Sequence, residues 1–146
     1  MPVDRFSLDT NLLVYAVDRD AGTRHQKAAG ILDAAVDRDC VLALQVLGEF
    51  FHTVTRKGKM PLDQAAAQVS DWQLLFPVVV PQVDTLACAI RAVTEHNLSF
   101  WDAMLWATVN AAGITILLTE DFQDGRTLGG VRFRNPFSMD DAFMGG

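Results

Sequence analysis

The segment Val3-Asp4-Arg5-Phe6-Ser7-Leu8-Asp9-Thr10-Asn11 opens the chain with a short, largely apolar run that ends at an acid. We interpret residues 3–8 as a first β-strand, because the run is short and apolar. Residues 11–17 are predicted to form a short helix behind it. Asp9 therefore lies between a strand and a helix, and the fold depends on whether strands and helices continue to alternate downstream.

Short apolar runs and helically spaced segments do alternate along the rest of the chain. Further strands are predicted at 40–44, 78–80, 114–118 and 131–133. Helices are predicted at about 23–36, 45–57, 61–76, 83–96 and 99–112, the first of them opened by the capping-box form Thr23-Arg24-His25-Gln26. Strands this short and apolar are buried on both faces. The pattern predicts an α/β fold, a three-layer α/β/α sandwich with a short parallel sheet.

Length and composition fit one globular domain. The chain has 146 residues, of which 50% are hydrophobic and 21% charged, and this composition excludes intrinsic disorder. Residues 1–137 are predicted to form one domain and residues 138–146 a loose tail. No apolar run approaches the roughly 18 residues of a membrane span, and Cys40 and Cys88 lack the spacing of a metal site. We therefore expect a cytoplasmic protein with reduced cysteines and no membrane association.

Three acidic side chains follow predicted strands. Asp9 follows the first strand directly, Asp121 lies in the loop after strand 114–118, and Glu49 lies one turn into the helix after strand 40–44. Each has a simpler explanation when taken alone: a helix N-cap for Asp9, an Asx turn for Asp121 and an exposed helix face for Glu49. Because the carboxyl ends of parallel strands meet at one edge of a sheet, we expect these acids to lie close together.

Asp102 has an unusual neighbourhood for an acid. The stretch Ser99-Phe100-Trp101-Asp102 fits a capping box, which would explain Asp102 as a structural residue. It nevertheless shares a helix face with large apolar residues, and a carboxylate turned toward a core needs a counter-charge. No Lys or Arg lies within ten residues of it on either side. A distant partner or a bound cation is therefore expected.

Clustered carboxylates of this kind predict a metal site. Carboxylates that repel one another raise one another's pKa, and all-oxygen ligands suit a hard cation, Mg²⁺ or Mn²⁺. Such a site supports phosphodiester hydrolysis, in which the cation activates a water and stabilises the departing oxygen. Asn11 could hold a ligand or a metal-bound water, and Thr119 could orient the carboxylate of Asp121.

Four segments in this order carry a family resemblance. They are Ser7-Leu8-Asp9-Thr10-Asn11, Glu49-Phe50, Ser99-Phe100-Trp101-Asp102-Ala103 and Leu118-Thr119-Glu120-Asp121-Phe122, with Gly125-Arg126 and Asn135-Pro136-Phe137 further on. Together they resemble the PIN-domain ribonucleases, most closely the VapC toxins of bacterial toxin–antitoxin pairs, over nearly the whole chain to about Phe137. The resemblance implies that the catalytic, metal-binding acids are Asp9, Glu49, Asp102 and Asp121. Glu120 adjoins Asp121, so either could be the fourth ligand.

The resemblance also implies an activity and partners. It implies a Mg²⁺- or Mn²⁺-dependent endoribonuclease that hydrolyses RNA phosphodiester bonds, forms a homodimer and is held inactive by a cognate antitoxin protein. The alternative is a catalytically silent PIN-like module that binds RNA or a protein partner without cutting. A phospho-acceptor signalling domain also places acids at strand ends, but it would need a lysine after a late strand, and none follows Lys59.

Charge and aromatic residues bear on how RNA would bind. Eighteen acidic and twelve basic residues give a net charge of −6, and two divalent cations, adding +4, would leave −2. Basic residues that could contact an RNA backbone, or merely cap a helix or line a strand edge, are Arg56, Lys57, Lys59 and Arg126. The aromatic group Phe100, Trp101 and Trp106 is predicted to be core rather than a base-stacking platform.

Overall fold

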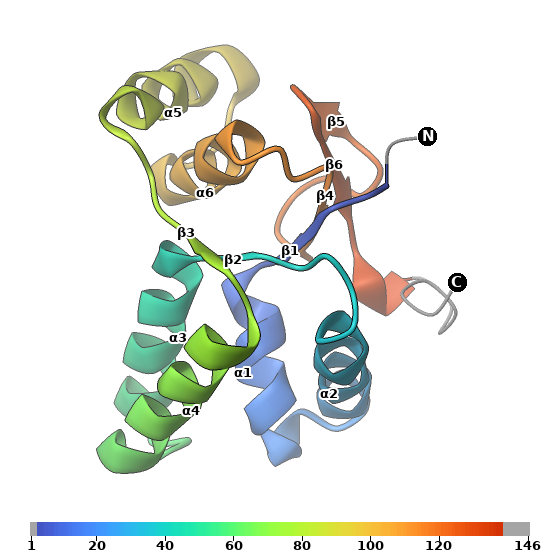
Figure 1. Ribbon diagram of the computed structural model, residues 1–146, viewed down its shortest axis with the longest axis vertical. Helices are drawn as coiled ribbons and strands as arrows, with labels where there is room; N and C mark the ends of the chain where they lie inside the picture. Colours follow the sequence, from blue (N-terminus) through green and yellow to red (C-terminus); the bar gives the residue numbers. More distant parts are fainter. Residues whose placement is uncertain (1–2, 139–146) are drawn as a thin grey trace.

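The computed structural model of the chain describes residues 3–138 and shows short strands alternating with helices (Figure 1). In chain order the elements are β1 (Phe6–Leu8), α1 (Thr10–Val17), the 3₁₀ helix η1 (Arg19–Ala21), α2 (Thr23–Ala35), β2 (Leu42–Ala43), α3 (Leu44–Arg56), α4 (Leu62–Leu75), β3 (Val78–Val79), α5 (Val83–His96), α6 (Phe100–Ala111), β4 (Ile116–Leu118), β5 (Thr127–Leu128), β6 (Val131–Arg134) and the 3₁₀ helix η2 (Pro136–Ser138). The predicted tail lies outside the described residues except for Ser138.

The strands form a central, mostly parallel sheet. One sheet has the order β1-β4-β6-β5, with β1 parallel to β4 and β4 parallel to β6. The second sheet pairs β2 with β3 in parallel, and a bridge between Phe6 and Cys40 links the two sheets. In Figure 1 helices α1–α4 occupy the lower half, α5 and α6 the upper left and strands β4–β6 the upper right, and β1, β2 and β3 cross the middle. The predicted three-layer α/β/α class with a short parallel sheet is confirmed.

Helices flank the sheet, and β1 and β4 at its centre are largely buried. Leu8 on β1, Leu117 on β4 and Phe133 on β6 have no exposed surface. Both cysteines are free, and Cys40 is buried within this core. Within residues 3–138, no helix is both long and apolar enough to cross a membrane.

A β-hairpin was missing from the sequence-based expectation. Strand β5 pairs antiparallel with β6 across a tight turn at Gly129 and Gly130. Gly129 has a φ of 57°, and a Cβ added there would meet Oδ1 of Asn110 at 2.9 Å. The turn is fixed from α6, because Asn110 Oδ1 accepts from the backbone N–H of Gly130 at 2.9 Å and Trp106 Nε1 donates to the carbonyl of Leu128 at 3.0 Å. These contacts join residues far apart in sequence, although the Gly129-Gly130 dipeptide is itself a typical two-residue hairpin turn.

The start of α2 also differs from the prediction. The helix begins at Thr23, but its N-cap is Gly22, and no side chain caps it. The capping box predicted at Thr23 is therefore wrong. Gly22 has a φ of 64°, a conformation that glycine adopts at little cost, and it lets the chain turn from η1 directly into α2.

Candidate active site

Asp9 lies at the end of β1, where it is buried and fixed on both carboxylate oxygens. It is the N-cap of α1, and its Oδ1 accepts from the backbone N–H of Thr10 at 2.6 Å. Its Oδ2 accepts from the hydroxyl of Thr119 at 2.6 Å, just beyond β4. The side chain is thus held between the carboxyl ends of two neighbouring parallel strands, as the sequence predicted for the acids as a group.

The environment of Asp9 disfavours its negative charge. Burial raises the pKa of Asp9 from 3.8 to about 7, although the hydrogen bonds from Thr119 and Thr10 act in the opposite direction. The negative charges of Asp121 and Asp102 raise the pKa further. Three acids from three different elements therefore act on one another, and a nearby cation would relieve their repulsion.

Glu49 joins this centre from α3. It is exposed, and its Oε1 accepts from the hydroxyl of Thr10 at 3.2 Å and from Nε2 of Gln45 at 3.1 Å. Gln45 Nε2 also donates to the backbone carbonyl of Trp101 at 3.0 Å, which ties the start of α6 to α3. Thr10 and Gln45 were not predicted as site residues, although both lie on the same helix turn as a predicted acid.

Asp121 joins the centre from the loop after β4. Its backbone N–H donates to the Thr119 hydroxyl at 3.1 Å, and its two oxygens accept from Nδ2 of Asn11 at 3.3 and 3.4 Å. Partial burial, followed by the charges of Asp102 and Glu120, raises the pKa of Asp121, while a hydrogen bond with the Asp9 side chain lowers it. Thr119 therefore orients Asp9 directly and Asp121 through its backbone.

Asp102 lies in the first turn of α6 and is half-buried. Its backbone N–H donates to Ser99 Oγ at 3.4 Å, so Ser99 is the N-cap. We expected the carboxylate to turn toward the apolar core, but its charge acts on Asp9 and Asp121 instead.

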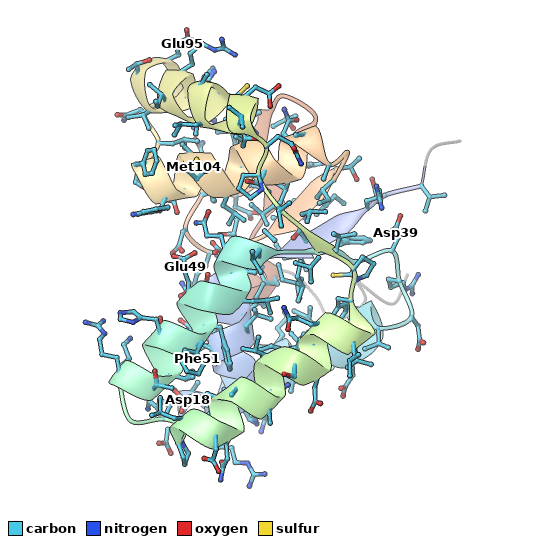
Figure 2. The ribbon with its side chains drawn as sticks, turned by 60° about the vertical axis from the view of Figure 1, so that its left-hand side comes forward. Asp18, Asp39, Glu49, Phe51, Glu95 and Met104 are labelled. Atoms are coloured by element: carbon cyan, nitrogen blue, oxygen red, sulfur yellow. The ribbon has the colours of Figure 1, made fainter. Side chains whose placement is uncertain are left out.

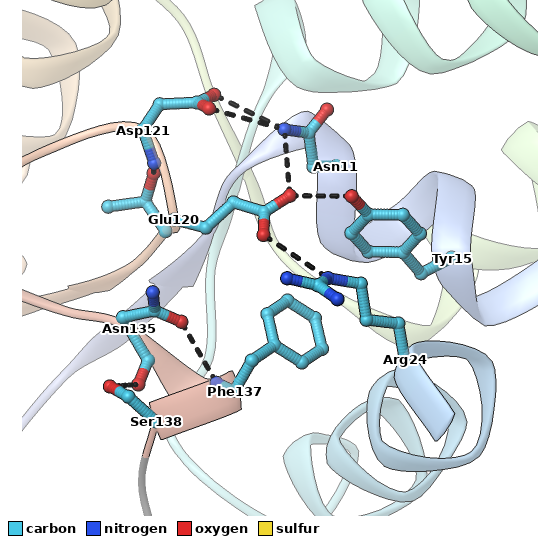
Figure 3. Close-up of polar contacts among 9 residues, drawn as sticks. Asn11, Tyr15, Arg24, Glu120, Asp121, Asn135, Phe137 and Ser138 are labelled. Atoms are coloured by element: carbon cyan, nitrogen blue, oxygen red, sulfur yellow. Dashed lines mark hydrogen bonds and ion pairs between the residues drawn. The ribbon is translucent and has the colours of Figure 1, made fainter. Parts of the chain in front are cut away.

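Glu120 faces another set of groups (Figure 3). Its Oε1 accepts from the hydroxyl of Tyr15 at 2.6 Å and from Nδ2 of Asn11 at 3.4 Å, and its Oε2 accepts from Nε of Arg24 at 3.4 Å. Burial and the contact with Glu120 raise the pKa of Tyr15 to about 12, so its hydroxyl keeps its proton and remains a donor. Sequence reasoning missed Arg24 and the role of Tyr15, because more than ninety residues separate each from Glu120.

The donor set suits a divalent cation. Within residues 3–138, no three Asp, Glu, His or Cys side chains stand together closely enough to enclose a metal ion. The predicted ligands nevertheless supply only carboxylate oxygens, which hard cations prefer. Burial and, after it, the charges of neighbouring acids raise the pKa of Asp9 and Asp121, so a bound cation would stabilise the ionised carboxylates here. The chemistry of these residues therefore fits Mg²⁺ or Mn²⁺.

Three of the four predicted RNA-contacting basic residues lie away from the acids. Lys59 pairs with Asp18, the C-cap of α1, at 3.3 Å, whereas Asp9 caps the opposite end of that helix. Figure 2 shows Asp18 well below Glu49. Arg56 and Lys57 lie beside Lys59, at the end of α3. The fourth, Arg126, donates from Nη2 to the carbonyl of His96 at 3.4 Å.

The aromatic residues of α6 are not all core residues as predicted. Trp106 is 8% exposed and belongs to the core, but Trp101 is 63% exposed and Phe100 37%. The rings of Phe100 and Trp101 pack edge to face at 4.9 Å. Trp101 therefore presents an aromatic surface to solvent immediately before Asp102.

Comparisons with known proteins place this arrangement in a family. A comparison with curated protein sequences found no significant match. The structure is similar to VapC20 of Mycobacterium tuberculosis, a sarcin–ricin loop cleaving toxin (TM-score 0.63, 20% identity, 80% of this chain and 91% of that one), and to a toxin–antitoxin complex from Klebsiella pneumoniae (TM-score 0.66, 20% identity, 91% and 98%). It is also similar to DNA-bound VapBC from Salmonella typhimurium (TM-score 0.66, 14% identity, 92% and 99%).

A family model carries the assignment further than these structural similarities. The model of the PIN domain matches residues 7–123, from the end of β1 through the loop that follows β4. That span contains Asp9, Glu49, Asp102 and Asp121, together with the helices that hold them. The chain belongs to the PIN domain family.

Proposed function

We propose that this protein is an endoribonuclease that depends on Mg²⁺ or Mn²⁺ and acts as the toxin of a toxin–antitoxin pair. The observation that carries the proposal is the convergence of acids on the carboxyl end of the sheet. Asp9, buried there, has its pKa raised to about 7 by burial and by the charges of Asp121 and Asp102. Keeping such a carboxylate buried among other acids costs stability, and a cation-dependent function explains why the cost is accepted.

The side chains have distinct tasks in this proposal. Asp9, Glu49, Asp102 and Asp121 would hold the cation. When bound, a divalent cation supplies an activated water and neutralises charge on the phosphate that is cut. Hydrogen bonds from Thr119 and Thr10 prevent the Asp9 carboxylate from rotating, and Gln45 restrains Glu49. Preorganised ligands of this kind need not rearrange when the substrate arrives.

Single-stranded RNA is the substrate that the surroundings of the acids favour. Trp101 is exposed, and its backbone is tied to Glu49 through Gln45. An exposed aromatic ring can stack on an unpaired base, whereas bases in a duplex are not accessible to it. Contacts of Arg56, Lys57, Lys59 and Arg126 with the RNA backbone stay predictions.

The toxin role draws on the structural neighbours. VapC20 is a toxin that cleaves the sarcin–ricin loop, and the proteins from Klebsiella and Salmonella are a toxin–antitoxin complex and a VapBC assembly. By analogy we propose that a cognate antitoxin protein inhibits this chain. We also propose that this chain forms a homodimer and acts in the cytoplasm. We further propose that residues 1–137 form a single nuclease domain.

The decisive experiment incubates the pure protein with mixed single-stranded RNA. Cleavage is expected with Mg²⁺ or Mn²⁺ and is expected to stop when a chelator is added. Asp71→Asn is a suitable control, because Asp71 is an exposed residue of α4. This variant should cleave RNA like wild type. RNA binding without any cleavage, over a range of both cations, would instead favour the catalytically silent PIN-like module.

A further inference from the structure

We propose that Tyr15, Arg24 and Glu120 form a positioning clasp that fixes Asn11 and, through Asn11, the carboxylate of Asp121. In this assignment Glu120 is an anchor rather than the fourth metal ligand. The proposal rests on the proposed function, because it concerns how the cation site is prepared. Figure 3 shows the groups concerned.

Both oxygens of Glu120 accept hydrogen bonds, as those of Asp9 also do, but Glu120 in addition already has a cation beside it, the Arg24 guanidinium. Oε1 accepts from Tyr15 at 2.6 Å and Oε2 accepts from Arg24 at 3.4 Å. The side chain of Glu120 is only 16% exposed, so water cannot replace these donors readily. A Glu120 that turned to a cation would have to give up both the hydrogen bond from Tyr15 and the ion pair with Arg24. Asp121 is exposed, and its contacts with Asn11, at 3.3 and 3.4 Å, are longer than the bond between Tyr15 and Glu120.

Aromatic packing holds the clasp together from the side opposite the acids. The Tyr15 and Phe137 rings meet edge to face, with centroids 5.4 Å apart. The Arg24 guanidinium lies over both rings, 5.2 Å from the Phe137 centroid and 5.9 Å from that of Tyr15. Because the clasp residues come from α1, α2 and the loop after β4, and Phe137 of η2 packs against two of them, the position of Glu120 is set by the tertiary fold and not by its own loop.

The clasp acts on the acidic centre through one amide. Nδ2 of Asn11 donates to Glu120 Oε1 at 3.4 Å and to the two Asp121 oxygens at 3.3 and 3.4 Å. Glu120 therefore orients the amide, and the amide orients Asp121. Asn11 also lies on the first turns of α1, the helix that Asp9 caps. Loss of the clasp should therefore loosen Asp121 relative to Asp9 without removing a ligand.

The test measures Mn²⁺ binding to the full chain by titration calorimetry. Tyr15→Phe removes only the hydroxyl that holds Glu120, and we expect it to weaken Mn²⁺ binding about tenfold, a typical cost of losing a partner that orients a ligand. Asp121→Asn should weaken it more. Glu95→Gln, an exposed change on α5, is the matched control and should bind like wild type.

A second variant and a second measurement keep the outcome decisive. Arg24→Met keeps an apolar stem over the rings but loses the ion pair, and it should weaken Mn²⁺ binding in the same direction even if Tyr15→Phe fails to fold. In RNA cleavage, both variants should need more Mn²⁺ for half-maximal rate and recover the wild-type rate at saturation, which general destabilisation would not produce.

The contrary results are distinct. If Glu120 were a ligand withheld by the clasp, Tyr15→Phe and Arg24→Met would bind Mn²⁺ more tightly than wild type. Tighter or unchanged binding in both variants overturns the clasp and leaves the proposed function standing. Failure of the wild-type protein to bind Mn²⁺ would overturn the proposed function, and the clasp with it.

Discussion

The hydroxyl of Thr119 donates to Oδ2 of Asp9 across 2.6 Å, although 110 residues separate the two in sequence. This bond joins the carboxyl ends of β1 and β4, which pair in parallel. It holds the carboxylate of Asp9 in place. Burial, and after it the negative charges of Asp121 and Asp102, raise the pKa of this carboxylate. Thr119 therefore links the end of β4 to the end of β1 and orients the carboxylate of Asp9.

Replacement of Thr119 should show whether its hydroxyl is needed to orient the Asp9 carboxylate or only for folding. Thr119→Val keeps the shape but removes the donor to Asp9, and we expect Mn²⁺ affinity and the RNA cleavage rate to fall by about 10- to 100-fold. Thr119→Ser retains the hydroxyl and should recover most of both. Binding measured on all three proteins checks this, and a Val variant equal to wild type would show that the bond is not needed for alignment.

The raised pKa of Asp9 predicts a pH-dependent stability in the presence of chelator. Asp9 has a pKa of about 7 in the folded chain and 3.8 as its ordinary value. The folded state therefore holds the proton more tightly, so its contribution to stability is complete below pH 4 and is lost as the pH rises through 7. Asn also caps helices well. Asp9→Asn should melt above wild type at pH 8, with the difference shrinking toward pH 4.

Melting curves from pH 4 to pH 8 test this directly, with Asp71→Asn as the control that follows wild type. A melting temperature of Asp9→Asn that stays below wild type at every pH would mean that the carboxylate stabilises the fold and is not strained by its neighbours.

Two residues at the start of α6 should show opposite effects. Ser99 is the N-cap, so Ser99→Ala is expected to cost about 1 kcal/mol of unfolding free energy and to leave Mn²⁺ binding intact. Asp102→Asn removes a charge that raises the pKa of Asp9 and Asp121. It should melt at or above the wild-type temperature without metal, and lose most of the stabilisation that Mn²⁺ gives wild type.

Denaturant unfolding and melting with and without Mn²⁺ distinguish the two variants. If both variants lose stability and Mn²⁺ still stabilises both as much as wild type, Asp102 only caps the helix and does not bind a cation.

Trp101→Ala should weaken binding of single-stranded RNA. The ring is 63% exposed, so its loss should hardly change the melting temperature, whereas stacking on one base is worth about 1–3 kcal/mol of binding free energy. Leu74→Ala on α4, at 86% exposure, is the matched apolar control. Fluorescence anisotropy with a labelled oligonucleotide measures the effect, and equal affinity of the two variants would exclude Trp101 from the RNA contact.

Sequence patterns located the acids because parallel strands impose a simple rule. A residue that follows a buried strand lies at the carboxyl edge of the sheet wherever the strand sits, so Asp9 and Asp121 could be placed together without knowledge of the strand order. The helix that follows a strand keeps its first turns near the same edge, which placed Glu49. The α/β class followed from the same alternation.

The parts that the sequence did not reveal depend on contacts between distant side chains. Tyr15 meets Glu120 across 105 residues, and Trp106 meets the carbonyl of Leu128 to hold the unpredicted hairpin of β5 and β6. The exposure of Trp101 could not be predicted from helical spacing, because it depends on what packs against the start of α6 in the folded chain. Local sequence patterns predict whether a segment is a helix or a strand, whereas the burial of a residue at the edge of a sheet depends on the tertiary fold.

The most direct test of the central claim is single-turnover cleavage of a single-stranded RNA by wild type, Asp9→Asn and Asp102→Asn, each with Mn²⁺ and with chelator. We expect wild type to cleave only with Mn²⁺, and both variants, while folded, to be slower by more than about 100-fold, beyond the usual cost of losing a partner that merely orients a ligand. Cleavage by wild type that persists in chelator, or wild-type rates in both folded variants, would contradict an acidic, cation-dependent centre at the ends of β1 and β4.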